Sequence, residues 1–406
     1  MQSFRGFSSW FTVGPDYRSR SRVWRAFVDP MRRLAFPALA WLSCLAAVAL
    51  AADHPTLPVG SQAPDFRLPG VDGRDYTLAS FAEARVLALI FTSNHCPTAQ
   101  AYEERIKSLV ADYAARGVAV VAINPNHAEA VRLDEMGYTD LGDTFEEMEL
   151  RAAHRGFNFP YLDDGPEQAV ARAYGPVATP HVFILDGERR LRFEGRIDDS
   201  ENPRHVTVSD TRAALDALLD GREPPATSTR VFGCSVKWKE KAADNTQWRA
   251  HVAKEPVTLE PADGAALEAL RANTSGKLRV INVWATWCGP CVAEFDELVE
   301  TNLRFRNRDF EMVTVAAEPP AAREKALAFL KRKGASMRNL IFADRNTYAS
   351  IEKIDPEWKG ALPYTMVVDP EGRIIFRHTG ALDFLELRRV IVPALDKIAP
   401  WPALAD

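Results

Sequence analysis

The sequence predicts an α/β protein built from two tandem copies of one unit, each a mixed β-sheet flanked by helices. In each copy an apolar strand leads directly into a cysteine and a helix, at Cys96 and at Cys288. In each copy a proline, a strand, a turn and a second strand follow later, starting from Pro180 and Pro363. The repeated order and the similar cysteine-to-proline intervals indicate duplication of one strand–helix–strand unit that ends in a hairpin.

The first copy is expected to contain four strands and two main helices. Tyr102, Ile106 and Leu109 recur at helical spacing after Cys96, which predicts the first helix. A closing helix is expected at 211–220, with Gly221 as its C-terminal cap. Apolar runs predict the strands 86–91, 118–123, 181–185 and 191–193.

The second copy repeats this pattern closely. A helix with Phe295, Leu298 and Leu303 on its inner face is expected to follow the second cysteine. Apolar runs again predict four strands, at 278–284, 310–316, 364–368 and 373–376.

Three segments organise the chain after its N-terminus. The first copy covers 55–222 and the second covers 257–400. The segment 223–256 between them begins as a Pro-, Ser- and Thr-rich linker, yet it also carries Cys234 and two tryptophans. Because flexible linkers are rich in small and polar residues, we expect its second part to pack onto a domain.

The N-terminal segment 1–52 is expected to be an export signal. Its core, 31–52, opens with Met31-Arg32-Arg33, continues as an apolar stretch and ends in Ala49-Leu50-Ala51. A charged start, an apolar core and a small-residue end are the three parts of a secretory signal. The stretch is also near the length of a membrane anchor, so a cleaved signal and a retained anchor both stay open. Both predict a periplasmic or otherwise extracytoplasmic protein, and Cys44 is expected to be a passive apolar residue.

Composition and charge exclude two classes of protein. The formal net charge is −5, so no bulk basic surface is available to nucleic acid, and no nucleic-acid partner is expected. The chain has only five cysteines, too few for a small fold held together by disulfides.

The strongest motif is the pair Cys288 and Cys291, at the junction of a strand and a helix. A cysteine at a helix N-terminus meets free N–H groups and the helix dipole, which stabilise the attacking thiolate. The second cysteine, one turn on, can then resolve a mixed disulfide. A zinc site would need a second pair of ligands at similar spacing, and none is nearby, so the motif predicts thiol–disulfide exchange.

The run Trp284–Cys291 resembles thioredoxin, and in particular the TlpA/ResA-like thioredoxins, over about residues 257–400. The resemblance implies a thioredoxin-like fold and a cis-proline loop at Leu362-Pro363 that faces the disulfide. It implies protein thiols and disulfides as partners, a membrane thiol reductant as the electron source, and no cofactor.

The same resemblance places Glu294 at the family's active-site glutamate. It lies three residues past Cys291, on the same helix face. A carboxylate there could relay a proton to or from Cys291, and the alternative is an exposed helix glutamate. Asp296 departs from the family, because many thioredoxin helices carry a kinking proline there.

Cys96 offers a single thiol at the equivalent junction, because Ala99 stands where a second cysteine would be. Its surroundings resemble the peroxiredoxin-like (AhpC/TSA-type) redoxins over about residues 55–240. The segments that carry this resemblance are 93–102, 195–199 and 232–238.

The resemblance implies a second thioredoxin-like domain, a redox role for Cys96 and a second cis-proline loop at Thr179-Pro180. Peroxidases of this family have a proline seven residues before the cysteine and a threonine three residues before it. Here Leu89 replaces the proline and Ser93 takes the hydroxyl position. Peroxide as a substrate of Cys96 therefore stays an open alternative.

Cys234 is the other single cysteine after the export segment. It could be a buried apolar residue, or it could form a permanent or cycling disulfide with Cys96, as the resolving cysteine. In an oxidising compartment two leftover thiols tend to be used, so the disulfide is the favoured expectation.

Three further side chains are candidates around Cys96. A metal site with His95 and His181 would have only one cysteine, so no metal is expected. A neutral His95 beside the thiol could aid its ionisation. Arg196 could also hold Cys96 as a thiolate, or could be a solvated strand residue.

The leading functional interpretation is an enzyme, an extracytoplasmic thiol–disulfide oxidoreductase. It is expected to reduce its substrates by dithiol exchange through Cys288 and Cys291. One alternative is a fused thiol peroxidase, in which Cys96 reduces peroxide and the C-terminal domain recharges it. A second alternative makes the N-terminal domain a partner-binding module without catalysis.

Overall fold

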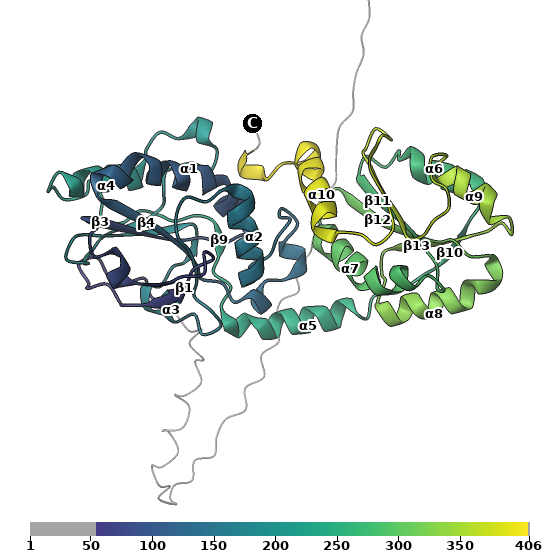
Figure 1. Ribbon diagram of the computed structural model, residues 1–406, viewed down its shortest axis with the longest axis horizontal. Coiled ribbons are helices and arrows are strands. Elements are labelled where there is room, and N and C mark those ends of the chain that lie inside the picture. Colours follow the sequence, from purple (N-terminus) through teal and green to yellow (C-terminus); the bar gives the residue numbers. More distant parts are fainter. Residues whose placement is uncertain (1–53, 405–406) are drawn as a thin grey trace, which may run out of the picture. The chain divides into compact units, whose positions relative to one another are not determined.

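The computed structural model describes residues 54–404 (Figure 1). The expected export segment, including Cys44, lies outside the described residues. Within 54–404, no helix combines the length and the apolar character that a membrane crossing requires. The described chain contains two mixed sheets with helices on both faces, so the expected α/β class with two units is confirmed.

The first sheet has the strand order β5-β4-β3-β7-β8, with β3, β4 and β5 parallel and β7 and β8 antiparallel to their neighbours. Its strands are β3 (Val86–Phe91), β4 (Val118–Asn124), β5 (Tyr161–Asp163), β7 (His181–Leu185) and β8 (Leu191–Gly195). One face packs on α1 (Pro97–Tyr113), α2 (Phe145–Arg155) and α4 (Asp210–Leu219). The other packs on α3 (Ala169–Tyr174) and on the segment that contains the hairpin β1 (Arg67–Pro69) and β2 (Asp75–Thr77).

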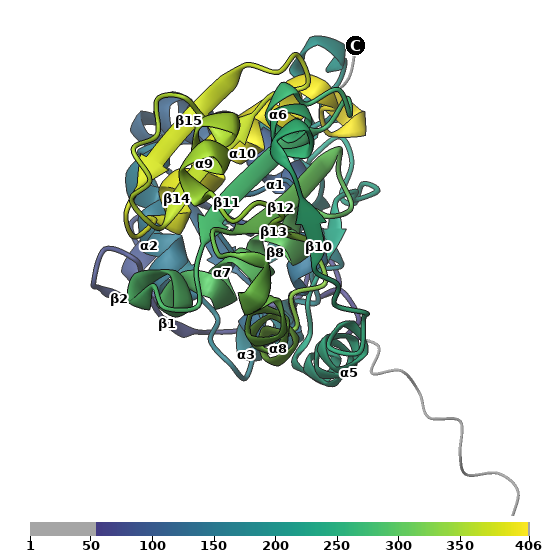
Figure 2. The ribbon, with the colours of Figure 1, turned by 90° about the vertical axis from the view of Figure 1, so that its right-hand side faces the viewer.

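The second sheet has the order β10-β13-β12-β11-β14-β15 (Figure 2). Its strands are β10 (Glu260–Ala262), β11 (Leu278–Trp284), β12 (Phe310–Ala316), β13 (Arg338–Phe342), β14 (Tyr364–Val368) and β15 (Ile374–Thr379). One face packs on α7 (Gly289–Phe305), α8 (Arg323–Lys333) and α10 (Phe384–Ile398). The other packs on α6 (Gly264–Ala272) and α9 (Thr347–Ile354).

The central strands β3 and β11 lie at the positions that the sequence predicts. Every residue of both strands is buried, because helices cover both faces of each sheet. Strands of this kind appear in sequence as continuous apolar runs. Each ends at the edge of its sheet where a cysteine and a 17-residue helix follow, α1 or α7, and this edge is where ligands bind in open α/β sheets.

The segment 223–256 contacts the domain that is built on the first sheet. Its short strand β9 (Cys234–Ser235) pairs antiparallel with β6 (Ala178–Thr179), and α5 (Ala242–Val252) follows. The Lys237 N–H donates to Asn126 Oδ1 at 2.8 Å, and the His127 N–H donates to the Lys237 carbonyl at 2.9 Å. The pairing with β6 and the two hydrogen bonds of Lys237, just after β9, therefore fix the position of this segment.

Two glycines that end helices provide a matched pair for testing the packing of the first unit. Gly156 after α2 and Gly175 after α3 both have positive φ, 59° and 65°. A Cβ at Gly156 meets nothing within 4 Å, whereas a Cβ at Gly175 would lie 2.1 Å from the Pro55 carbonyl oxygen. Only the second substitution therefore forces the backbone to move.

We expect Gly156→Ala to lower the free energy of unfolding by about 1 kcal/mol, the cost of a left-handed alanine. Gly175→Ala should cost at least about 2 kcal/mol more, because the clash adds to the same conformational cost. Urea unfolding of the two variants measures the difference. Equal losses would contradict the packing of Pro55 against the end of α3.

Candidate functional site

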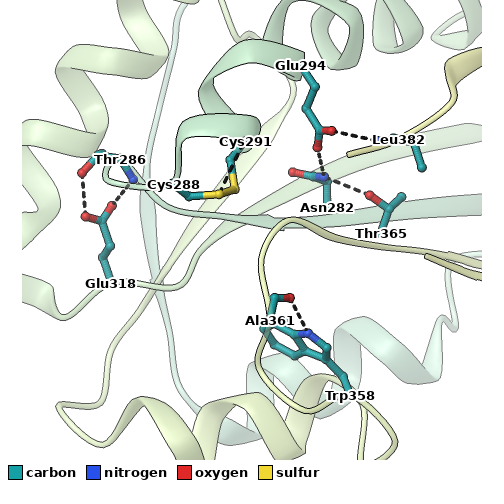
Figure 3. Close-up of a disulfide and its surroundings, with 10 residues drawn as sticks. All are labelled: Asn282, Thr286, Cys288, Cys291, Glu294, Glu318, Trp358, Ala361, Thr365 and Leu382. Carbon is teal, nitrogen blue, oxygen red and sulfur yellow. Dashed lines mark hydrogen bonds between the residues drawn. A yellow bond between two sulfur atoms is a disulfide. The ribbon is translucent and has the colours of Figure 1, made fainter. Parts of the chain in front are cut away.

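Cys288 and Cys291 form a disulfide at the start of α7, with their Cα atoms 5.3 Å apart (Figure 3). Cys288 is the N-cap residue, and its Sγ accepts the Cys291 N–H at 3.3 Å. Pro290 sits in the first turn, where its missing N–H costs nothing. Cys288 is slightly exposed and Cys291 is fully buried, so the first sulfur is the one that an external group can reach.

A buried carboxylate holds the loop in front of this disulfide. Glu318 accepts the Thr286 N–H at 3.1 Å and the Thr286 hydroxyl at 2.7 Å (Figure 3). Sequence reasoning missed Glu318. The available signal was its position just after β12, the strand parallel to β11, because adjacent parallel strands end at the same edge of a sheet.

Glu294 is buried, so the alternative of an exposed helix glutamate is wrong. Its carboxylate accepts the Leu382 N–H at 3.1 Å and the Asn282 side-chain amide at 3.4 Å. Burial raises the pKa of Glu294, and these two hydrogen bonds offset part of that rise. A carboxyl group one helical turn past Cys291 can therefore hold a proton at a higher pH than an exposed glutamate does.

The Leu362-Pro363 peptide is cis, as the resemblance implied. The loop in front of it is fixed by the Trp358 indole N–H, which donates to the Ala361 carbonyl at 2.8 Å (Figure 3). Trp287, directly before the first cysteine of the pair, is 69% exposed. Large exposed aromatic side chains are typical of protein contact sites.

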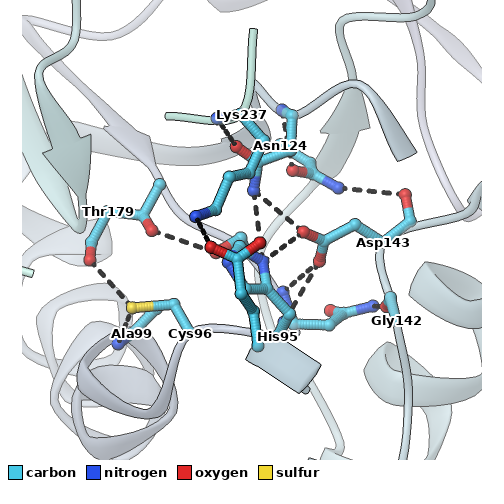
Figure 4. Close-up of polar contacts among 12 residues, drawn as sticks. His95, Cys96, Ala99, Asn124, Gly142, Asp143, Thr179 and Lys237 are labelled. Atoms are coloured by element: carbon cyan, nitrogen blue, oxygen red, sulfur yellow. Dashed lines mark hydrogen bonds and ion pairs between the residues drawn. The ribbon is translucent and has the colours of Figure 1, made fainter. Parts of the chain in front are cut away.

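Cys96 occupies the matching position in the first unit. It is the N-cap residue of α1, and its Sγ accepts the Ala99 N–H at 3.4 Å (Figure 4). The Thr179 carbonyl lies 3.2 Å from the same sulfur, and the Thr179-Pro180 peptide is cis. Unlike Cys288, Cys96 is completely buried.

A buried carboxylate also holds the loop in front of Cys96. Asp143 accepts the N–H groups of Asn94 and His95 at 2.7 and 3.2 Å, and its other oxygen lies 2.5 Å from His95 Nδ1 (Figure 4). Burial opposes its ionisation, but His95 and these donors hold the pKa of Asp143 below its usual value. Sequence reasoning missed Asp143, because nothing in the pattern linked it to the cysteine.

Asp143 acts against burial at His95. Burial alone lowers the pKa of His95, but the Asp143 carboxylate outweighs burial and the net pKa is raised. The carboxylate therefore favours protonation of the ring, and the neutral His95 expected beside Cys96 stays a prediction.

Arg196 does not contact Cys96, so the expectation that it holds the thiolate is wrong. Its Nε donates to Asp210 Oδ2 at 2.7 Å, because Asp210 begins the helix beside the strand. His181 is also occupied elsewhere, with Nε2 2.9 Å from Glu194. Among residues 54–404, no three His, Cys, Asp or Glu side chains are grouped so that they could hold a metal ion.

Cys234 lies beside Cys96, and both are free thiols in this structure. Strand β9 places Cys234 opposite Thr179, whose carbonyl contacts the Cys96 sulfur, so the two cysteines are neighbours. Burial alone raises the pKa of Cys96, but its interactions with Cys234 and His95 outweigh burial and lower the net pKa. The interaction with Cys96, together with burial, raises the pKa of Cys234. The disulfide expected between them stays a prediction.

Comparison with known families assigns both units. The AhpC/TSA family model matches residues 59–194, and the Redoxin model matches residues 254–391. The chain therefore carries an AhpC/TSA-type and a redoxin-type domain in tandem, both with a thioredoxin-like fold, and with the relatives below it belongs to the thiol–disulfide oxidoreductases.

Two curated relatives support this assignment. The thiol:disulfide interchange protein CycY of Rhizobium leguminosarum bv. viciae is 32% identical over 189 residues, which cover 42% of this chain and 92% of that protein. A DsbE homolog of Paracoccus denitrificans, also a thiol:disulfide interchange protein, is 31% identical over 121 residues, 30% of this chain and 60% of the relative.

A crystal structure of a hypothetical protein from Sinorhizobium meliloti 1021 is 39% identical. The match covers 45% of this chain and 96% of the Sinorhizobium meliloti chain, with a TM-score of 0.41.

The buried carboxyl group gives a prediction with a matched control. Glu294→Gln should slow the release of mixed disulfides from Cys288 at least about tenfold at pH 7, because the proton relay to Cys291 is lost. The control is Glu297→Gln, on the exposed face of the same helix, which should change the rate little. Rapid-quench kinetics with a disulfide substrate measures both, and equal rates in the two variants would contradict a role for Glu294.

The raised pKa of Glu294 also predicts a stability effect of known sign. The folded protein binds this proton more tightly than the unfolded chain does, so Glu294 contributes stability at acid pH. That contribution is lost as the pH rises through the raised pKa. Glu294→Gln should therefore leave the free energy of unfolding at pH 7 unchanged or increased, which separates a kinetic defect from a folding defect.

Proposed function

We propose that the chain reduces disulfides of other proteins outside the cytoplasm, through Cys288 and Cys291. The observation that carries the proposal is a disulfide at the start of α7 whose first sulfur is reachable and whose second is buried. This asymmetry supports attack by Cys288 and resolution by Cys291. The names of the two curated relatives, both thiol:disulfide interchange proteins, support the same chemistry.

The reaction starts from the reduced pair. The Cys288 thiolate attacks one sulfur of the substrate disulfide, a mixed disulfide forms, and the other substrate sulfur leaves as a thiolate. Cys291 then attacks Cys288 Sγ and releases the second substrate thiol, while Glu294 accepts the Cys291 proton. The substrate disulfide is reduced to two thiols, and the pair is oxidised to the disulfide that the structure contains.

The substrate is a protein segment that lies against the cis-proline loop. The exposed Trp287 and the loop at Leu362-Pro363 provide the apolar contact surface beside Cys288. A membrane thiol reductant then returns the pair to the dithiol state, with two electrons for each cycle. Peroxide reduction by Cys96 is left out of this proposal, because that sulfur is completely buried and Leu89 replaces the proline of the peroxidases.

We expect Cys288→Ser to remove most of the catalysed reduction of insulin disulfides by dithiothreitol, because Cys288 carries the reachable sulfur of the pair within one helical turn. Cys96→Ser is the matched control, a cysteine at the same position of the other domain, and it should keep most of the activity. Turbidity of precipitating insulin measures both. Equal loss in the two variants would sink the assignment of catalysis to the C-terminal domain.

Export predicts a defined N-terminus. If the segment 31–52 is a cleaved signal, mass spectrometry of protein from the producing cell's envelope should find a chain that begins at Ala52. A chain that retains this segment in the membrane fraction would make it an anchor instead. An intact chain in the cytoplasm would refute the extracytoplasmic site of action.

A further inference from the structure

Cys96 and Cys234 both lie against Thr179 but differ in exposure. Cys96 is completely buried, whereas Cys234 is partly exposed. The neighbours of Cys234 in the chain, Gly233 and Ser235, are both exposed. A molecule that approaches this pair from solvent therefore meets Cys234 first.

The position of Cys234 is built into the fold. Strand β9 pairs Cys234 with Thr179, whose carbonyl also contacts the Cys96 sulfur at 3.2 Å. A Cβ at Gly233 would lie 2.1 Å from that same carbonyl oxygen, and Gly233 has a φ of +140°. Only glycine permits this approach, so the backbone next to Cys234 is shaped to hold the two sulfurs together.

The charges around the pair favour an ionised Cys96. The imidazole of His95, held by Asp143, lies next to Cys96, and His95 Nε2 is buried without a hydrogen-bond partner. Lys237, in the same segment as Cys234, is paired with Glu135 at 2.6 Å, so its charge is largely neutralised. Burial opposes the ionisation of Cys96, but the Ala99 N–H, which donates to its sulfur at 3.4 Å, and the nearby Cys234 and His95 lower the net pKa of Cys96 and favour a thiolate there.

We propose that Cys96 and Cys234 form a second dithiol–disulfide centre, in which Cys234 exchanges with external thiols and disulfides and Cys96 acts as the buried resolving thiolate. The assignment reverses the roles that the sequence suggested, where Cys96 attacks and Cys234 resolves. It does not depend on Cys288 and Cys291, so it can be tested independently of the function proposed above.

Oxidation of the pair by an external disulfide balances as follows. As Cys234 attacks one external sulfur, its proton moves to the neighbouring Cys96 sulfur, and the other external sulfur leaves as a thiolate. Cys96 then gives up this proton and attacks Cys234 Sγ, which breaks the mixed disulfide and releases the second external thiol. The external disulfide gains two electrons, and the Cys96–Cys234 bond forms with the loss of two.

The reverse reaction explains why the buried sulfur needs a lowered pKa. An external thiolate attacks Cys234 Sγ, and Cys96 leaves as the thiolate that Ala99 and His95 stabilise. Thiols of low pKa leave faster in disulfide exchange. A second external thiol then frees Cys234, and its proton stays on the Cys234 sulfur.

The test uses the full chain with Cys44, Cys288 and Cys291 changed to serine, so that only the proposed pair remains. The probe is 5,5′-dithiobis(2-nitrobenzoate), an aromatic disulfide that releases a coloured thiolate at each exchange. The two-cysteine chain should release two equivalents and end as an internal disulfide. With Cys96→Ser, one equivalent should be released and the label should stay on Cys234.

Cys234→Ser should react at least about tenfold more slowly than the two-cysteine chain, because its remaining sulfur, that of Cys96, is buried. Faster labelling of Cys96 in Cys234→Ser than of Cys234 in the chain that keeps both cysteines would overturn the proposed order of attack. Two retained labels on the two-cysteine chain, with no internal disulfide, would overturn the pair itself.

Folding is controlled in two ways. Cys96→Ala, which removes the sulfur without adding a hydroxyl, should repeat the result of Cys96→Ser, and thermal unfolding checks both. In the two-cysteine chain, acid quenching at early times followed by peptide mapping locates the first label without any change at the pair. That label should be on Cys234, and a first label on Cys96 would overturn the proposal even if every variant were misfolded.

Discussion

A hydrogen bond from a free helix N–H to the sulfur of the preceding cysteine occurs in both domains, and the rest of each site is arranged around it. The Ala99 N–H donates to Cys96 at 3.4 Å and the Cys291 N–H donates to Cys288 at 3.3 Å. The fully buried strands β3 and β11 bring each cysteine to this position. A helix N-terminus provides donors and a positive dipole end, and both favour a thiolate over a thiol.

A buried carboxylate stabilises the loop before each cysteine. Asp143 accepts the N–H of Asn94, and Glu318 accepts the N–H of Thr286, each two residues before its cysteine. The two carboxylates differ in their other partners. Asp143 is paired with His95, whereas the second oxygen of Glu318 accepts the Thr286 hydroxyl. The first site therefore has a histidine paired with its buried carboxylate, and the second has a threonine in that role.

The two domains differ most in what covers the cysteine. In the second domain the next cysteine lies in the helix, and the exposed Trp287 directly precedes the slightly exposed Cys288. In the first domain Ala99 takes that helix position, and strand β9 brings Cys234 from the following segment to Thr179, beside Cys96. The same fold thus carries a disulfide within one helical turn in one domain. In the other it carries two thiols that are far apart in the sequence and close together in space.

The sequence predicted the strands and the motif-bearing residues well, for physical reasons. Central strands are buried on both faces and appear as continuous apolar runs, whereas the edge strand β10 has only three residues and two of them are exposed, so it gave no signal. Glu294 was located by resemblance to a family motif. Asp143 and Glu318 were missed because only the tertiary fold brings them to their cysteines, and Arg196 was misassigned because its nearby partner, Asp210, was not considered.

The central claim is that one chain carries two redox centres on two copies of one fold. The most direct measurement is a redox titration of the full chain in glutathione buffers, with each cysteine located by differential alkylation and peptide mapping. The account predicts two separate two-electron couples, in which Cys288 changes state together with Cys291, and Cys96 together with Cys234. A single couple at Cys288 and Cys291, with Cys96 and Cys234 still alkylated as free thiols under the most oxidising conditions, would contradict it.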